Sequence, residues 1–416
     1  MISRKNAHRG LVVVFMIMFL DVIGIAIIMP VLPTYLHELT GEDVSATAVE
    51  GGWLLLVYAA MQFLFAPLIG NLSDRFGRRP LLLASVLTFA IDNLICALAT
   101  SYWMLFVGRV LAGISGASFG TAAAYIADVS TDETRARNFG LMGIAFGTGF
   151  ALGPVIGGIL GEFGPRVPFY GAALLAMLNF AVACAVLPES LGRENRRRFE
   201  LSRSNPLGAL QQMRNYPGIL PIGIVFFCYW LAHSVYPSVW PFVSAYRYGW
   251  SEGQIGLSLG VFGIGGALVM AFILPRIVPV LGEWRTAALG LSFSVMGLLG
   301  YAAAWQGWMV YAVIVLTTLE NLADPPLRSI AAAKVPPSAQ GELQGALTSL
   351  SSITTIIGPL IFTQMFGLFT GEEAIVDFSG ASYLLGALIL ATGTAVFILR
   401  VRQSDQAAGA SPVTVG

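Results

Sequence analysis

Charge is scarce in this sequence, and the shortage excludes most soluble folds. Only 11% of the 416 residues are Asp, Glu, Lys or Arg, whereas soluble domains carry roughly 25%. Basic and acidic residues balance at 23 each, so we expect no basic surface and no nucleic-acid partner. The three cysteines all lie inside apolar runs, and they predict neither a disulfide framework nor a metal site.

The chain is instead rich in apolar runs of about 20 residues, the length that crosses a hydrocarbon core. Hydrophobic residues make up 56% of it. The first run continues through Pro30 and Pro33 without a small-residue cleavage site, so no cleavable signal peptide is expected. We therefore predict an all-α membrane protein with twelve transmembrane helices, at 11–36, 52–71, 80–99, 103–127, 138–160, 168–187, 218–243, 255–276, 284–304, 308–333, 343–367 and 379–400.

The basic residues predict the orientation of these helices. Twenty of the 23 Lys and Arg residues fall on one side of the predicted membrane, and only Arg166 and Arg247 fall on the other. Because Lys and Arg accumulate in cytoplasmic loops, both termini are expected in the cytoplasm. The polar segment 188–217, which carries six arginines, is predicted to be a cytoplasmic linker.

A shift of 205 residues brings landmarks of the first half onto the second. Transporters are often built from such repeats. The shift predicts two homologous six-helix halves, 1–187 and 218–402, joined by the linker and followed by a cytoplasmic, disordered tail at 403–416. The matching landmarks are Trp103 with Trp308, Gly77 with Gly282, Gly140 with Gly345, and Gly153-Pro154 with Gly358-Pro359.

Two motifs carry a resemblance to a known family. GNLSDRFGRR (70–79) has the form G-x-L-a-D-r-x-G-r-r, and the pattern G-x8-G-x3-G-P-x2-G-G begins at Gly140. Both are similar to signatures of the major facilitator superfamily, and the second is associated there with antiporters that export. The chain resembles the tetracycline-efflux group of drug:proton antiporters from about residue 12 to 400, most clearly in LDVIGIAIIMPVLP (20–33), YIADVSTDETRARNFG (125–140), LPES (187–190), NPL (205–207) and GELQGALTSLSSITTIIGPLIF (341–362).

The resemblance implies a proton-coupled antiporter that exports tetracycline-like or other amphipathic drug-like compounds by alternating access. It also implies a bacterial cytoplasmic membrane, lipid and a small-molecule substrate as partners, function as a monomer, and no cofactor besides the proton gradient. An alternative is a proton-coupled symporter that takes up a small organic solute. No nucleophile–base set, metal cluster or phosphate-binding loop predicts an enzyme.

The two motifs supply candidates for conformational control. Glycines spaced i, i+4, i+8 form a smooth stripe on one helix face, which serves either close packing alone or a sliding surface between the halves. Asp74 is either a latch that holds a helix N-terminus or an arginine, or it stands among charges that only mark topology. The candidates are Gly70, Asp74, Arg75, Gly77, Arg78, Arg79, Asp128, Arg135, Gly149, Gly153, Pro154 and Gly157.

Ionisable residues inside predicted spans are costly and are functional candidates by default. The efflux group has acids in spans 1 and 3 and an arginine in span 4, at places that match Asp21, Asp92 and Arg109. An arginine needs an anion nearby, so we expect an ion pair here that couples to protons, or a fixed structural pair. Proton coupling is assigned to Asp21, Asp92, Arg109, Glu320 and Asp324.

The tenth span is where the chain departs from that group. Glu320 and Asp324 fall at i and i+4 beside Pro325 and Pro326, which should break or kink the helix. On one helix face the two carboxylates would disfavour each other's ionisation, unless Arg328 simply neutralises Asp324. The group's histidine in span 8 and acid in span 9 fall on Gly266 and Ser294.

Aromatic residues at helical spacing in span 7 predict one wall of a substrate cavity, or else interior packing around one hydrogen-bonded histidine. Polar side chains in spans 2 and 3 could add contacts. The predicted cavity residues are Gln62, Asn93, Tyr229, His233, Tyr236 and Trp240.

Overall fold

The computed structural model describes residues 4–197, 199, 218–336 and 339–401. Within these ranges, ten helical stretches are long and apolar enough to cross a membrane. One of them, Glu252–Ala303, holds two predicted spans, because Gly282 leaves helical geometry with φ 76° and ψ 165°. The span predicted at 308–333 is divided into three short helices. Each of the twelve predicted spans is therefore helical in the structure, and the fold class is confirmed.

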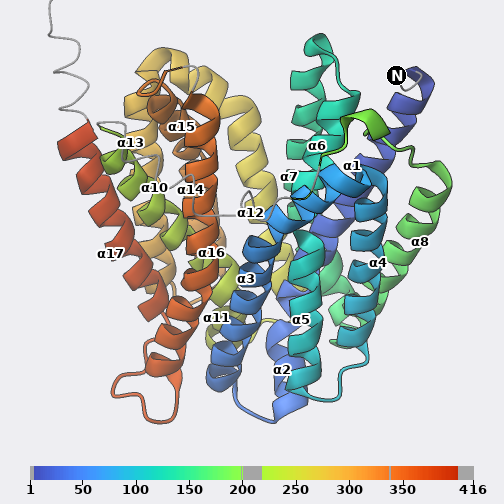
Figure 1. Cartoon of the computed structure of the whole chain (residues 1–416). Helices are drawn as coiled ribbons and strands as arrows, with labels where there is room; N and C mark the ends of the chain where they lie inside the picture. Colours follow the sequence, from blue (N-terminus) through green and yellow to red (C-terminus); the bar gives the residue numbers. More distant parts are fainter. Residues whose placement is uncertain (1–3, 198, 200–217, 337–338, 402–416) are drawn as a thin grey trace, which may run out of the picture. The chain divides into compact units, whose positions relative to one another are not determined.

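The described residues group into two compact units (Figure 1). The first unit holds the residues up to 206 together with Ser244–Gly263, and the second holds 207–243 and the residues from Ile264 onward. The helices up to the linker are α1 (Arg4–Ala26), η1 (Met29–Val31), α2 (Leu32–Thr40), α3 (Val44–Phe76), α4 (Arg78–Ala97), α5 (Tyr102–Gly116), α6 (Phe119–Val129), α7 (Asp132–Gly161), α8 (Val167–Val186) and η2 (Arg193–Asn195).

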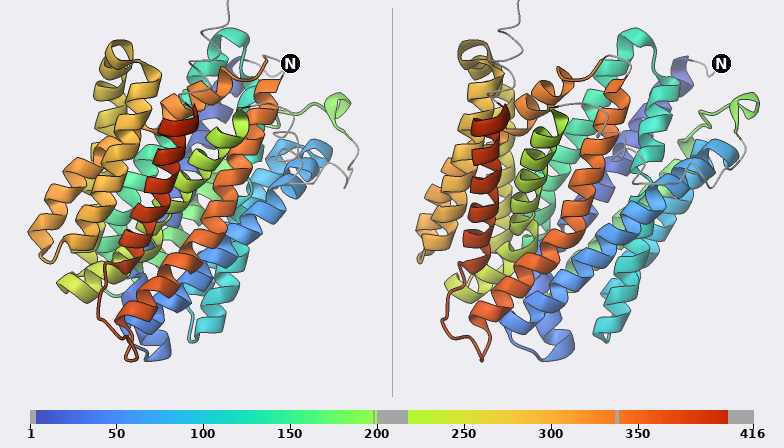
Figure 2. Two further views of the ribbon diagram at one scale, coloured as in Figure 1. Left: turned by 90° about the vertical axis from the view of Figure 1, so that its left-hand side faces the viewer. Right: turned by 60° about the vertical axis from the view of Figure 1, so that its left-hand side comes forward.

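The helices after the linker contain more interruptions. Two five-residue π-helical segments, η5 and η8, continue α12 and α17. Figure 2 shows α16 and α17 as neighbouring helices joined by a loop at one end. The elements are α10 (Ile219–His233), α11 (Val235–Tyr248), α12 (Glu252–Leu268), η5 (Val269–Ile273), α13 (Leu274–Ala303), α14 (Gly307–Thr317), η6 (Thr318–Leu322), α15 (Asp324–Ala332), α16 (Gln340–Thr370), α17 (Ala381–Val396) and η8 (Phe397–Val401).

Equivalent positions in the two repeats adopt equivalent structures. Gly77 (φ 105°, ψ 159°) and Gly282 (φ 76°, ψ 165°) share a positive-φ turn that L side chains rarely adopt. Trp103 and Trp308, each in the first turn of a helix, are 69% and 68% exposed, as aromatic residues at a membrane interface are. The internal repeat predicted from the 205-residue shift is thus borne out at these positions.

The predicted linker and tail lie largely outside the described residues, so the division into 1–187, 188–217, 218–402 and 403–416 stays a prediction. One hydrophobic core cluster of the first unit joins α1, α4, α6, α7 and α8. Its buried side chains include Val14, Ile17, Leu82, Val86 and Tyr125. This packing fixes α1 and α4, the two helices that carry the acids Asp21 and Asp92.

Candidate functional site

Three ionisable residues meet inside the first unit. Asp21 on α1, Asp92 on α4 and Arg109 on α5 are all buried, and Asp92 is completely so. Asp92 lies within electrostatic range of both Arg109 and Asp21. Three helices that are separate in sequence therefore bring two carboxylates and one guanidinium together, as the sequence predicted.

The expected ion pair is not closed in this structure. Arg109 donates from Nη2 to Cys96 Sγ at 3.4 Å, and its guanidinium lies 6.0 Å from the ring centre of Phe169. Asp92 Oδ1 accepts from the side chain of Asn93 at 2.7 Å. Across the described part of the chain, Arg109 Nε and Asp92 Oδ2 have no hydrogen-bond partner. Cys96, one turn beyond Asp92 on α4, accepts the hydrogen bond from the Arg109 guanidinium. The positive charge of Arg109 therefore balances the Asp92 carboxylate through space and not through a direct hydrogen bond.

Sequence reasoning missed Tyr58, which α3 places within electrostatic range of all three charged groups. The one feature of the sequence that could have drawn attention to Tyr58 is its position one helical turn before Gln62.

The Gln62 amide donates to the Gly116 carbonyl at 3.1 Å, and Asn93 is fully buried with its amide directed to Phe89 and Asp92. Both amide groups have partners inside the helix bundle, and their role in substrate binding stays a prediction.

A second ionisable cluster lies in the other unit. Glu320 on η6 is fully buried, and its Oε2 accepts from Tyr236 at 3.1 Å and from Ser294 Oγ at 2.9 Å. Its Oε1 lies 3.2 Å from His233 Nδ1. Residues from α10, α11 and α13 thus converge on one carboxyl group.

Glu320 and Asp324 do not lie on one continuous α-helix, which their predicted i, i+4 spacing assumed. A 3₁₀-helix ends at Leu322 and a new α-helix begins at Asp324, so the α-helical spacing between the two acids does not hold. The break expected at Pro325 and Pro326 is confirmed. Asp324 instead bonds Arg328 at 2.7 Å and accepts from Trp230 Nε1 at 3.2 Å, which favours the alternative of neutralisation.

The two positions that depart from the efflux group both lie next to η6. A Cβ atom at Gly266 would lie 2.9 Å from the side chain of Asn321, so Asn321 fills that space. Ser294 is in direct contact with Glu320. The uncharged Ser294, which stands where the efflux group has an acid, is therefore in contact with the acid Glu320 of η6.

The aromatic residues predicted in span 7 form a connected cluster, although α10 ends at His233 and α11 begins at Val235. The His233 ring stacks on Tyr229 at 5.9 Å and meets Tyr236 edge-on at 5.2 Å. Trp240 packs edge-on against Tyr301 of α13 at 4.9 Å. Tyr229, Tyr236 and Trp240 are buried, which fits interior packing, whereas the His233 side chain is 28% exposed.

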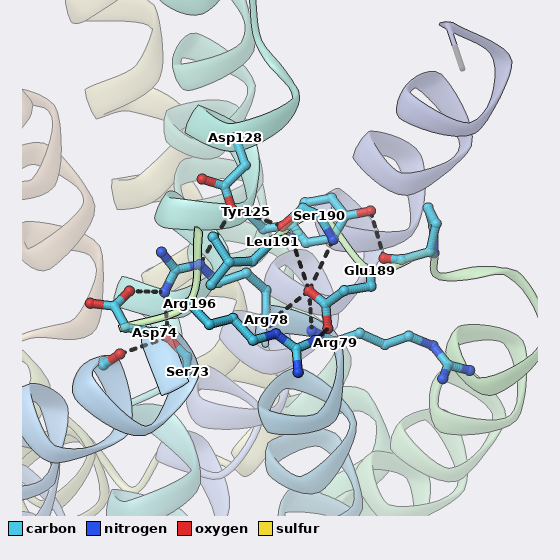
Figure 3. Close-up of polar contacts among 12 residues, drawn as sticks. Ser73, Asp74, Arg78, Arg79, Tyr125, Asp128, Glu189, Ser190, Leu191 and Arg196 are labelled. Carbon is cyan, nitrogen blue, oxygen red and sulfur yellow. Dashed lines mark hydrogen bonds and ion pairs between the residues drawn. The ribbon is translucent and has the colours of Figure 1, made fainter. Parts of the chain in front are cut away.

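The GNLSDRFGRR motif forms a polar network at one end of the first unit. Figure 3 shows the Arg78 guanidinium between Asp74 and Asp128, at 2.5 Å and 3.3 Å. Arg78 also donates to Ser73 Oγ at 2.6 Å, and Ser190 donates to Asp128 at 2.8 Å. The Asp74 partner is therefore an arginine, and Arg78 is buried and paired, which a residue that only marks topology need not be.

The other candidates in this motif differ in setting. Gly70 and Gly77 are both expected from the sequence to allow a tight turn in this motif. Gly77 makes the turn between α3 and α4, but Gly70 lies inside α3 with open space around it, so the expectation is wrong for Gly70. Arg75 lies over the Phe76 ring at 5.0 Å, and Arg79 donates to the Cys184 carbonyl at 2.8 Å. Arg135 lies on the first turn of α7.

Glu189 is a member of this network that the sequence did not single out. Its Oε1 accepts from the backbone N–H groups of Arg78 at 2.8 Å, Ser190 at 3.0 Å and Leu191 at 3.1 Å. A carboxylate at the first N–H groups of a helix satisfies donors that have no partner within the helix. Arg196 Nη2 lies 3.8 Å from the other oxygen of Glu189. The start of the linker therefore caps α4.

We expect Glu189→Ala to lower the free energy of unfolding by about 1–2 kcal/mol, the usual effect of losing a helix cap. Glu189→Gln keeps an oxygen acceptor at Arg78 and Ser190 and should lose less. Thermal unfolding of the purified protein in detergent measures both. An alanine variant that unfolds at the wild-type temperature would contradict the capping role.

The glycine stripe of α7 packs on α1 and so lies within one half. A Cβ atom at Gly149 would lie 3.0 Å from Val22, one at Gly153 would lie 2.6 Å from Ala26, and one at Gly157 would overlap the Ile27 carbonyl. The interpretation of these three glycines as a surface between the halves is therefore wrong. They hold α1, the helix of Asp21, close to α7.

The neighbouring face of α7, which includes Pro154, meets the start of α12. Cβ atoms at Gly256 or Gly158 would overlap backbone atoms of Pro154 and Glu252 respectively, so each helix offers small residues to the other. Glu162 accepts from the Gly253 N–H at 2.9 Å. Ser251 and that N–H hold the pKa of Glu162 below its ordinary value. The sequence feature that could have predicted this contact is the set of glycines on α12, Gly256, Gly260 and Gly263, which face α7.

We expect Gly157→Ala to destabilise the protein by about 1–3 kcal/mol, because the added methyl group overpacks α7 against the backbone of Ile27, the residue after the end of α1. Gly147→Ala is the matched control, since it lies on the same helix with nothing within 4 Å of the added atom. Unfolding in detergent compares the two. Equal unfolding temperatures would show that the contact with α1 is loose.

The sequence matches the model of the Major Facilitator Superfamily over residues 14–359. It is 38% identical to the tetracycline resistance protein, class C, of Escherichia coli over 92% of this chain and 95% of that protein. It is 39% identical to the class E protein of Escherichia coli over 86% and 88% of the two chains. A bacterial homologue of the human lysosomal transporter Spinster has a similar structure, with a TM-score of 0.76, 16% identity and coverage of 97% and 99%. The chain is thus a multi-pass membrane protein that belongs to the Major Facilitator Superfamily.

Proposed function

We propose that this protein exports tetracycline or another amphipathic drug-like compound in exchange for protons. The observation that carries the proposal is the buried cluster of Asp21, Asp92 and Arg109 in the first unit. Such residues are costly inside a membrane and are kept where protons or ions move. The similarity to tetracycline resistance proteins over more than 85% of the chain supports a drug as the substrate.

In this proposal, Asp92 is the proton-binding group and Arg109 balances its charge. Because Arg109 is held by Cys96 and not by a carboxylate, protonation of Asp92 changes the field at Arg109 without breaking a direct ion pair. Asp21 lies on α1, which the glycines of α7 hold closely, so a change in charge at Asp21 is transmitted to the α1–α7 contact. Glu320 contributes a second site in the other unit.

We further propose that the protein works as a monomer in the cytoplasmic membrane of a bacterium, with both termini inside. The distribution of Lys and Arg supports this orientation. The network around Arg78 then lies at the cytoplasmic face, where Asp74, Asp128 and Glu189 would steady one state of the transport cycle.

The proposal is tested by expression in a drug-hypersensitive bacterial host. We expect the protein to raise resistance to tetracycline or to at least one amphipathic cation in a panel. A variant with both Asp21→Asn and Asp92→Asn, present in the membrane at the same level, should give none. Unchanged susceptibility to the whole panel would contradict the proposal.

A further inference from the structure

The carboxyl group of Glu320 is fully buried, yet among the described residues hydrogen-bond donors reach only one of its oxygens. Oε2 accepts from Tyr236 and Ser294. Oε1 and His233 Nδ1 face each other at 3.2 Å, and neither atom has a hydrogen bond within the described ranges. This separation is within the distance range of a hydrogen bond, although the orientation of the two groups in this structure does not make one.

Charge balance requires one proton on this pair beyond the N–H that a neutral imidazole already carries. A buried carboxylate is unfavourable unless a positive charge or a bound proton compensates it. Arg328, the arginine on the next helix, is bonded to Asp324 at 2.7 Å, and that pair adds no net charge. The titratable and charged groups around Glu320 are Tyr229 and His233 on α10, Tyr236 on α11, Tyr301 on α13, and Asp324 and Arg328 on α15. Among these, His233 is the group that can supply a positive charge near neutral pH.

Aromatic rings surround His233. Its ring lies 5.9 Å from Tyr229, 5.6 Å from Trp230 and 5.2 Å from Tyr236. Its side chain is 28% exposed, whereas that of Glu320 has no exposed surface. His233 is thus the member of the pair that reaches the surface of the structure.

We propose that His233 and Glu320 form a dyad that binds one exchangeable proton in the second unit, separate from the acids of the first. Ser294 and Tyr236 hold the carboxylate in place, and His233 exchanges the proton with water. With the proton bound, the dyad is an imidazolium beside a carboxylate. When the proton leaves to water, a neutral imidazole and a carboxylate remain, with one negative charge. The role in transport rests on the proposed function, whereas proton binding by the dyad does not.

The first test is a double-mutant cycle on drug transport. Glu320→Gln and His233→Asn should each lower proton-driven drug uptake into everted vesicles about tenfold or more and flatten its pH profile. The double variant should be no worse than the poorer single variant, because the two residues act on one proton. Thr318→Val is the matched control, since within the described residues the Thr318 hydroxyl bonds to the Val315 carbonyl of its own helical turn, at 2.8 Å. Losses that multiply in the double variant would overturn the dyad.

The second test needs no transport and no substitution at Glu320. Infrared spectra of purified wild-type protein and of His233→Asn are compared during a pH titration. Without the imidazole, Glu320 has no positive partner and must carry a proton itself, so a carboxylic acid band should appear near neutral pH. Identical spectra of the two proteins over the whole titration would overturn the dyad. The band would appear even if the protein transported no drug, so the two proposals fail separately.

Discussion

Asp92→Asn is expected to reduce proton-driven drug transport by about 100-fold or more, the scale on which acid–base groups contribute, while the protein still inserts and folds. Asp92 is fully buried, and its Oδ1 accepts a hydrogen bond from Asn93 at 2.7 Å. The introduced amide oxygen can accept the same bond, so the packing of α4 is kept. What is lost is the ability to bind and release a proton. Uptake of tetracycline and of a cationic dye into everted vesicles, per amount of protein, measures the loss.

Asp43→Asn is the matched control for this prediction. Asp43 caps α3 by accepting from the Ala46 N–H at 2.8 Å, and asparagine caps helices about as well as aspartate. The control should therefore transport like the wild type. Transport by Asp92→Asn at the level of the control would show that Asp92 has no role in coupling.

Arg109→Ala is expected to be nearly as severe, with Arg109→Lys intermediate. Alanine removes the positive charge that balances Asp92, and an uncompensated buried charge typically costs about 3–5 kcal/mol. Lysine keeps the charge but loses the planar group that reaches Cys96 Sγ and lies over Phe169. We expect Arg109→Lys to lower the transport rate about tenfold and Arg109→Ala to lower it about a hundredfold.

The control for a lost arginine is Arg166→Ala. Arg166 pairs with Glu38 at 2.9 Å, and both side chains are partly exposed. Such pairs contribute only about 0–1 kcal/mol, so the loss of transport should be slight. Equal transport by Arg109→Ala, Arg109→Lys and the wild type would contradict the charge-balancing role.

Features set by local composition could be predicted from the sequence. Apolar length placed the twelve spans, and the requirement of glycine for positive φ marked the turn at Gly77 and its repeat at Gly282. Asp21, Asp92 and Arg109 were found because charge is rare in apolar helices. These predictions succeed because each depends on a residue and its near neighbours.

The failures involve contacts between distant segments or departures from regular geometry. The spacing of Glu320 and Asp324 assumed one continuous α-helix, but η6 is a 3₁₀-helix and α15 starts anew. Glu189 caps a helix that begins 111 residues earlier in the sequence, which no local pattern reveals. The Arg109 guanidinium bonds a cysteine, a weak acceptor that sequence reasoning does not rank beside a carboxylate.

The stripe of glycines shows the same limit. Its spacing indicated close packing, and the structure has close packing. The partner segment was not predictable, because Gly157 would suit any segment with an open backbone, and it meets Ile27, the residue after the end of α1. The second contact of α7, with Gly256 of α12, needed both helices in place before it could be recognised.

The most direct test of the proposed function is proton movement from everted membrane vesicles whose interior has been acidified by respiration. A pH-sensitive dye reports the gradient while tetracycline and a panel of amphipathic compounds are added one at a time. Vesicles with the wild-type protein should lose part of the gradient with at least one compound, and vesicles with Asp92→Asn should not. Drug uptake without any drug-dependent proton movement in the wild type, or the same movement with Asp92→Asn, would contradict proton-coupled export.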